Sequence, residues 1–124
     1  MSYGVIYLWT VKAECLHEHT LVMDAIVREQ RESCPEVLMN FTFGPSAQGQ
    51  CAEVQIFPDQ AKADNFGSRV QNELPQLQEL WGRLEPFIEG QTHRHTFESN
   101  PHFAESFLRA GTGIGGIEAQ GSDV

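Results

Sequence analysis

Basic residues are scarce in this chain of 124 residues. Only 8 lysines and arginines stand against 17 aspartates and glutamates, which gives a formal net charge of -9 at pH 7. A surface with this balance repels phosphate backbones and anionic membrane surfaces. The composition therefore argues against nucleic acid and against a membrane surface as partners.

Cysteine is also sparse, and no long hydrophobic run occurs. The three cysteines, Cys15, Cys34 and Cys51, are odd in number and lack Cys-x-x-Cys spacing. Such thiols are typical of a reducing compartment, whereas small secreted domains usually carry paired cysteines. The apolar run within MSYGVIYLWTVKAE is too short to span a bilayer and has no basic region before it. We therefore expect a cytoplasmic protein without a signal peptide or a membrane helix.

Motifs that bind cofactors are missing as well. The chain has no glycine-rich phosphate loop, and its possible metal ligands are two histidine pairs, His17 with His19 and His93 with His95. In an antiparallel sheet the fourth strand could bring His93 near His17, so a four-histidine metal site is one alternative. The simpler interpretation is a polar helix start and a polar strand face. The sequence thus favours a protein with no bound metal, flavin or other cofactor.

Two periodicities alternate along the first half of the chain. Beta-branched and aromatic residues are concentrated in YGVIYLWTVKA, which favours a strand. Apolar residues at helical spacing follow and stop before Pro35, and two segments with alternating apolar positions then flank the loop GPSAQGQ. These patterns predict a strand over residues 5–12, a helix over 20–34 and a hairpin with strands over 36–44 and 51–57.

The second half continues the same alternation. Asp59 can accept from the first free amide groups of a helix, whose apolar residues recur at helical spacing as far as Leu84. Pro75 predicts a break near Glu73, because proline lacks an N–H and clashes with the preceding turn. The segment 91–98 is a fourth strand. We divide the chain into one domain over 1–98 and a C-terminal helix with a flexible tail over 99–124.

The order strand, helix, strand, strand, helix, strand predicts an α+β fold, a ferredoxin-like sandwich with an antiparallel four-stranded sheet and helices on one face. The other face of the sheet needs a cover. We assign to it residues that are too apolar to be left in water and too polar for a dry core: Leu38, Asn40, Thr42, Gln55 and Phe57. A second copy of the chain would cover it, so a homodimer is expected.

The chain resembles the antibiotic biosynthesis monooxygenase family of dimeric α+β barrels. The resemblance covers roughly Tyr3 to Phe97, and its most telling parts are SCPEVLMNF, similar to the family's turn into the second strand, and EVQIFPDQAKADNF, similar to its strand end and helix start. Asn40, Gln55 and Phe57 stand where the family has a tyrosine, a glutamate and a tryptophan. The resemblance implies a cofactor-independent monooxygenase for anthrones, quinols or polyketide-type aromatics, or a related isomerase.

Five residues are candidates for binding a small aromatic ligand. Tyr7 and Trp9 share one face of the first strand and would form an aromatic wall, or else belong to the core. Asn40 and Gln55 carry neutral amides that would bind a ligand's carbonyl or hydroxyl group, and Phe57 lies on the same side of its strand as Gln55. We therefore predict that these five residues bind the substrate.

THRHTF supplies the candidates for catalysis. Alternation places His93, His95 and Phe97 on one face of the fourth strand and Arg94 on the other. Histidine titrates near neutral pH, so His93 or His95 is the predicted general base that takes a proton from the substrate. The alternative is a plain strand, and with it a non-catalytic ligand-binding or dimeric interaction protein of the same fold.

Overall fold

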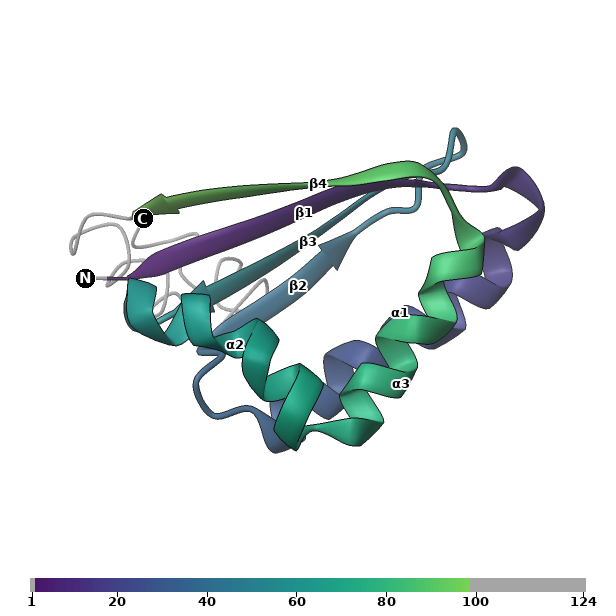
Figure 1. Cartoon of the computed structure of the whole chain (residues 1–124). Coiled ribbons are helices and arrows are strands. Elements are labelled where there is room, and N and C mark those ends of the chain that lie inside the picture. The colour runs from purple at the N-terminus through teal and green to yellow at the C-terminus, as the bar shows by residue number, and fades with distance from the viewer. Residues whose placement is uncertain (1, 99–124) are drawn as a thin grey trace, which may run out of the picture.

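A computed structural model describes residues 2–98 as a sheet covered by helices (Figure 1). The helix and tail predicted over 99–124, and with them the domain boundary, lie outside the described residues. Two short 3-10 turns, η1 (Ala13–Cys15) and η2 (Glu85–Phe87), join longer elements. These are β1 (Tyr3–Val11), α1 (Leu16–Ser33), β2 (Met39–Phe43), β3 (Gln50–Phe57), α2 (Gln60–Glu73), α3 (Pro75–Leu84) and β4 (Ile88–Glu98).

The four strands form one sheet in the order β2-β3-β1-β4, and every neighbouring pair is antiparallel. All three helices lie on the same side of this sheet, with α1 behind α3 in the view of Figure 1. The arrangement confirms the predicted α+β ferredoxin-like sandwich. Within residues 2–98, no helix is long and apolar enough to cross a membrane.

The start of α2 and the break before α3 confirm two sequence predictions. The Asp59 carboxylate accepts from the backbone N–H of Lys62 at 2.8 Å and so caps the first turn of α2. Pro75 occupies the first position of α3, where its missing N–H costs no hydrogen bond. The long apolar stripe of this region is therefore divided between two helices that meet at Leu74.

The predicted start of α1 at Thr20 is wrong, because the helix begins at Leu16. The turn η1 leads directly into it, so the polar stretch HEH belongs to the helix. His19 is buried, and Met23, one turn later on the same face, is buried too. Because histidine is a polar residue, His19 interrupts the apolar pattern of the helix, and the pattern therefore did not reveal the first turn.

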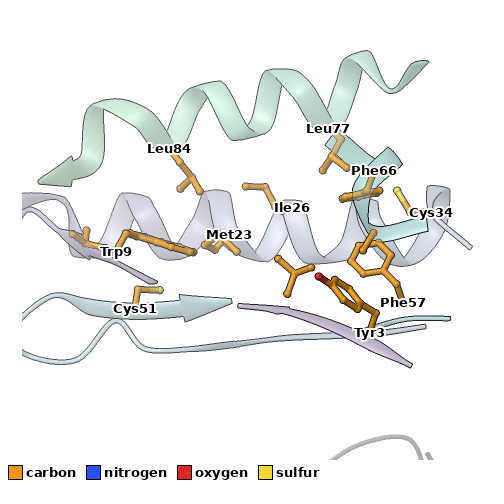
Figure 2. Packing of buried hydrophobic residues seen from close by; sticks show 13 residues of the cluster. Tyr3, Trp9, Met23, Ile26, Cys34, Cys51, Phe57, Phe66, Leu77 and Leu84 are labelled. Atoms are coloured by element: carbon orange, nitrogen blue, oxygen red, sulfur yellow. The ribbon is translucent and has the colours of Figure 1, made fainter. Parts of the chain in front are cut away.

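The hydrophobic core lies between the sheet and the helices. Figure 2 shows Trp9 of β1 beside α1 and Phe57 of β3 beside Phe66 of α2, while Ile26 of α1 and Leu77 of α3 point into the space between these two helices. Ile26, Phe57 and Leu77 have no measurable exposure. Complete burial of one such side chain stabilises the fold by about 1.5–3 kcal/mol.

The register of the strands decides which residues face the helices. Residues directly opposite one another in neighbouring strands share a face. Tyr7 of β1 lies opposite Glu53 of β3 and Arg94 of β4, and Glu53 lies opposite Thr42 of β2. Because Trp9, two positions from Tyr7, belongs to the core, this whole row lies on the helix side of the sheet.

This register overturns one sequence prediction. The sequence predicts Asn40, Gln55 and Phe57 on the face that a second copy covers, but they lie on the helix side, and all three are buried. On β2 and β3 the more apolar set of alternating residues, with Phe41 and Val54, faces away from the helices, so the strand pattern did not show which face turns inward. The helices, not a second copy of the chain, cover these residues.

The face of the sheet that no helix within residues 2–98 covers, called the open face below, is more apolar than predicted. Exposed side chains on it include Leu8, Phe43 and Phe97, at 40%, 56% and 37% of their full exposure. Aliphatic and aromatic residues surround them on all four strands, and two histidines of β4 complete the face. Its other members are Ile6, Met39, Phe41, Ala52, Val54, Ile56, His93 and His95.

The cap of α2 gives a direct test of the fold. Asp59→Ala removes the side-chain acceptor for the Lys62 amide, so we expect the free energy of unfolding to fall by about 1 kcal/mol in denaturant titration. Asp64→Ala, in the exposed middle of the same helix, is the matched control and should change stability by less than about 0.5 kcal/mol. Equal losses in the two variants would show that the cap contributes nothing specific.

Candidate functional site

A cleft of about 340 Å³ lies between the helix side of the sheet and helices α2 and α3. Its wall is largely aromatic. The Trp81 ring lies 6.4 Å from the ring centroids of both Tyr7 and Trp9, and it meets Trp9 edge-on at 77°. The remaining lining residues are Gln55, Phe66, Gly67, Val70, Leu84, Glu85, Ile88 and Thr92. A planar apolar ligand fits such a wall, because ring edges and faces pack against it.

The cleft brings together three of the five predicted substrate-binding residues, Tyr7, Trp9 and Gln55. Asn40 and Phe57 lie elsewhere on the same side of the sheet. Phe57 packs in the core, with its ring centroid 5.4 Å from that of Phe66, and Asn40 bonds to α1. Gln55 is thus the amide of the predicted pair that contacts the cleft.

His93 and His95 do not line the cleft. They lie on the open face with Phe97, while Arg94 points to the helix side, as alternation predicts. All of these residues are exposed. The predicted role of the two histidines as a base stays a prediction, and it applies to the face opposite the cleft.

The four-histidine alternative is not supported by the positions of the side chains. Histidine, cysteine, aspartate and glutamate side chains form no group of three or more that could hold a metal ion within residues 2–98. His19 is instead buried against the cleft wall. The indole Nε1–H of Trp9 donates to its Nε2 at 2.9 Å.

This hydrogen bond and the burial of the ring determine the protonation state and the tautomer of His19. Burial lowers its pKa, so the imidazole is neutral at pH 7. Because Nε2 accepts a hydrogen bond, the proton of the neutral ring is on Nδ1, which has no partner among the described residues. His19 thereby holds the Trp9 ring in the cleft wall. Sequence reasoning missed this role, since HEH was interpreted as a polar helix start.

A chain of polar side chains links α1 to the sheet behind the cleft. The Arg31 guanidinium donates through Nε to Oδ1 of Asn40 at 3.1 Å and through Nη2 to the Asn40 carbonyl at 3.2 Å. Asn40 in turn donates through Nδ2 to Oε1 of Gln30 at 2.8 Å. The far end of Gln30, its Nε2, has no hydrogen-bond partner in the described part of the chain.

Glu53 is the residue that sequence reasoning passed over. It is completely buried, and neither of its carboxyl oxygens has a well-aligned hydrogen-bond partner within residues 2–98. Burial raises the pKa of Glu53 to about 8, and the neighbouring amides of Gln30 and Gln55 act in the opposite direction. The group is therefore largely a neutral acid at pH 7. A buried, perturbed carboxyl beside a cleft is a frequent mark of a functional site.

Comparisons with known proteins establish the fold. No family model matches the sequence, and no curated protein matches it. A crystal structure of an antibiotic biosynthesis monooxygenase is 17% identical with a TM-score of 0.65, covering 80% of this chain and 99% of that chain. A variant of SnoaB, a cofactor-independent oxygenase from Streptomyces nogalater, is 9% identical with a TM-score of 0.63, covering 80% and 93%.

A conserved protein from Methanosarcina mazei is similar in shape as well, with 11% identity, a TM-score of 0.66 and coverage of 81% of this chain and 94% of that chain. At identities this low, structural likeness speaks for the fold alone. The chain has the fold of the antibiotic biosynthesis monooxygenases, which confirms the resemblance at the level of fold.

The buried acid predicts an unusual dependence of stability on pH. An unfolded glutamate loses its proton near pH 4.5, whereas folded Glu53 keeps it to about pH 8. Unfolding between these values releases a proton, so the free energy of unfolding falls as pH rises from 4.5 to 8. Glu53→Gln cannot ionise and lacks this loss. Relative to the variant, the wild-type protein should lose more than about 1 kcal/mol between about pH 5 and about pH 8.

Denaturant titrations at a series of pH values measure this difference. Glu79→Gln, an exposed carboxylate of α3, is the matched control and should keep the wild-type slope. Parallel curves for the wild-type protein and Glu53→Gln would contradict the neutral buried acid.

Proposed function

We propose that this chain is a member of the antibiotic biosynthesis monooxygenase family, acting as a cofactor-independent monooxygenase-like enzyme. Its substrate is a small aromatic or polyketide-type molecule bound in the cleft. The observation that carries the proposal is the composition of the cleft wall, in which the amide of Gln55 lies among the aromatic rings of Tyr7, Trp9 and Trp81. Such a wall takes up a planar ring system and orients it by one polar contact.

The chemistry suited to this wall is oxidation of an activated methylene, as in a hydroxyanthrone. A base removes a proton, and the resulting carbanion gives its electrons to dioxygen. The peroxide that forms loses water, so one oxygen atom becomes the new carbonyl and the other leaves as water. The Gln55 amide would donate to the oxygen on which negative charge develops. The aromatic rings would exclude bulk water from the reacting carbon.

The general base could lie on either face of the sheet, in the cleft or on the open face. In the cleft, Glu85 is the carboxylate and Tyr7 the other titratable group among the lining residues of the described part of the chain. His93 and His95 remain the sequence-based candidates, and they reach a ligand only on the open face. The position of the base therefore decides which face of the sheet carries the reaction.

Oxygen consumption with a hydroxyanthrone tests the proposal, without added cofactor and with a metal chelator present. We expect turnover, and we expect Gln55→Leu to lower kcat/KM by at least about tenfold, since one donor to the developing charge is lost. Glu79→Gln is the control and should retain the wild-type rate. Normal turnover in Gln55→Leu, together with its loss in His93→Ala or His95→Ala, would move the reaction to the open face.

A non-catalytic ligand-binding protein is the second candidate. The observation in its favour is that most of the wall of the cleft cannot transfer protons, because it consists of aromatic, aliphatic and amide side chains. Saturable binding of the hydroxyanthrone, followed by quenching of tryptophan fluorescence, without oxygen consumption would favour this function.

We also propose that two copies of the chain associate through the open face. Phe43 and Leu8 are exposed there, and contiguous apolar surface of this kind marks an interface. The Phe43→Glu variant would place a charge in the interface, so light scattering at micromolar concentration should show dimers for the wild-type protein and monomers for the variant.

Leu21→Glu is the matched control for this substitution. Leu21 is exposed to 57% on α1, away from the open face, and its replacement should leave the dimer intact. A monomeric wild-type protein would end the dimer proposal.

A further inference from the structure

The polar chain behind the cleft has a fixed direction. A guanidinium can only donate, so Arg31 holds the carbonyl end of the Asn40 amide toward itself. Asn40 then offers its N–H to Gln30, which accepts through Oε1 and turns its own Nε2 away. That Nε2 is unpartnered within the described residues and lies beside the carboxyl of Glu53. The acid is thus flanked by a donor whose orientation is set at the protein surface.

On its other side Glu53 meets the cleft wall. Gln55 follows two positions later on the same strand face, and its amide lies beside the Glu53 carboxyl. Gln55 is only 2% exposed, yet it lines the cleft. Its amide group therefore has two competing neighbours, the acid behind the wall and a ligand in front of it.

Ionisation of Glu53 changes this competition, because the neighbours that residues 2–98 place beside it are uncharged. From α1 it is faced by the Gln30 amide, and from β3 by Cys51, whose pKa burial raises to about 11. His19, the buried titratable group of α1, is neutral because burial lowers its pKa. Tyr7 on β1 and the hydroxyl of Thr42 on β2 complete its row. Two charged side chains are separated from Glu53 by another residue. Arg31 is bound to Asn40, and Arg94 lies opposite Tyr7 on the far side of β1. Helix α3 packs over the core with Leu77, Trp81 and Leu84.

We propose that Glu53 is a positioning residue whose neutral form leaves the Gln55 N–H free to donate to a ligand oxygen, while its ionised form withdraws that donor. A carboxylate only accepts, and a buried one draws every N–H within reach. The neutral acid binds such donors more weakly, so Gln55 can turn its N–H to the cleft. The ligand class that follows is a planar aromatic with a carbonyl or phenolate oxygen. Since the ligand site is the cleft, this inference rests on the proposed function.

Two matched probes separate the effect of the Gln55 N–H donor from the effect of the negative charge on Glu53. Anthraquinone-2-sulfonate carries carbonyl acceptors, anthracene-2-sulfonate does not, and both keep the same charge over the pH range used. The only tryptophans of the chain, Trp9 and Trp81, line the cleft, so quenching of their fluorescence reports binding of either probe. We expect the Kd of the quinone to rise roughly tenfold between about pH 6.5 and about pH 9.5, because a buried hydrogen bond is lost.

Anthracene-2-sulfonate measures the part of this loss of affinity that comes from the negative charge of Glu53 alone. Its own loss of affinity should be at least about threefold smaller than that of the quinone. This comparison needs no variant. An equal loss for both probes would overturn the positioning role of Glu53, because the donor would then contribute nothing.

Variants test whether the loss of affinity at alkaline pH arises from Glu53 and Gln55. Glu53→Gln, which stays neutral, should bind the quinone equally well at both pH values, and Glu53→Leu should behave likewise. Gln55→Leu should bind the two probes alike at every pH, and Glu79→Gln should follow the wild-type profile. An alkaline loss that persists in Glu53→Gln and Glu53→Leu would contradict the inference.

The outcomes for the inference and for the proposed function are distinct. The expected binding profile without oxidation of a hydroxyanthrone would leave the inference standing and remove the monooxygenase. Oxidation whose rate does not depend on Gln55, and whose pH profile is the same in the wild-type protein and in Glu53→Gln, would leave the monooxygenase standing and remove the inference. If neither probe binds at any pH, the cleft is not an aromatic site and both proposals fall.

Discussion

The pairing of β1 with β3 is the constraint on which the rest of the structure depends. Placing Tyr7 opposite Glu53 and Val5 opposite Gln55 turns the odd-numbered residues of both strands toward the helices. The aromatic wall, its amide and the buried acid therefore come to one side of the sheet together. A shift of one residue in this pairing would turn β3 over and move Glu53 to the open face. The same alternation places His93 and His95 on the opposite side from the cleft.

The fold could be predicted because its signals are local. Asp59 marks a helix start and Pro75 a helix break through chemistry that acts within one turn. Alternation correctly grouped Tyr7 with Trp9 and His93 with His95. Grouping residues by face does not say which face the helices cover, however. On β2 and β3 the helices cover the more polar set of alternating residues, the reverse of what burial of apolar side chains predicts.

The site was harder to predict because it places polar groups where the sequence suggests solvent. An alternating strand with a glutamate, such as CAEVQIF, suggests that the charged side chain points outward. Glu53 is nevertheless buried, and Gln30 and His19 on the apolar face of α1 are buried with it. Each unpartnered buried polar atom costs about 1–3 kcal/mol, a cost that a purely structural core would avoid. The presence of such atoms beside the aromatic cleft favours a role for these groups in binding, because functional sites retain features that do not favour stability.

The central claim is that a planar ligand binds between the sheet and helices α2 and α3, and not on the histidine-bearing open face. Two-dimensional ¹H–¹⁵N NMR during titration with anthraquinone-2-sulfonate tests it most directly, since the indole N–H groups of Trp9 and Trp81 give the only two signals of their kind. The account predicts that both indole signals shift together with the backbone amide of Gly67, while those of His93 and His95 stay in place. Shifts confined to His93, His95 and their neighbours, with unchanged indole signals, would contradict it.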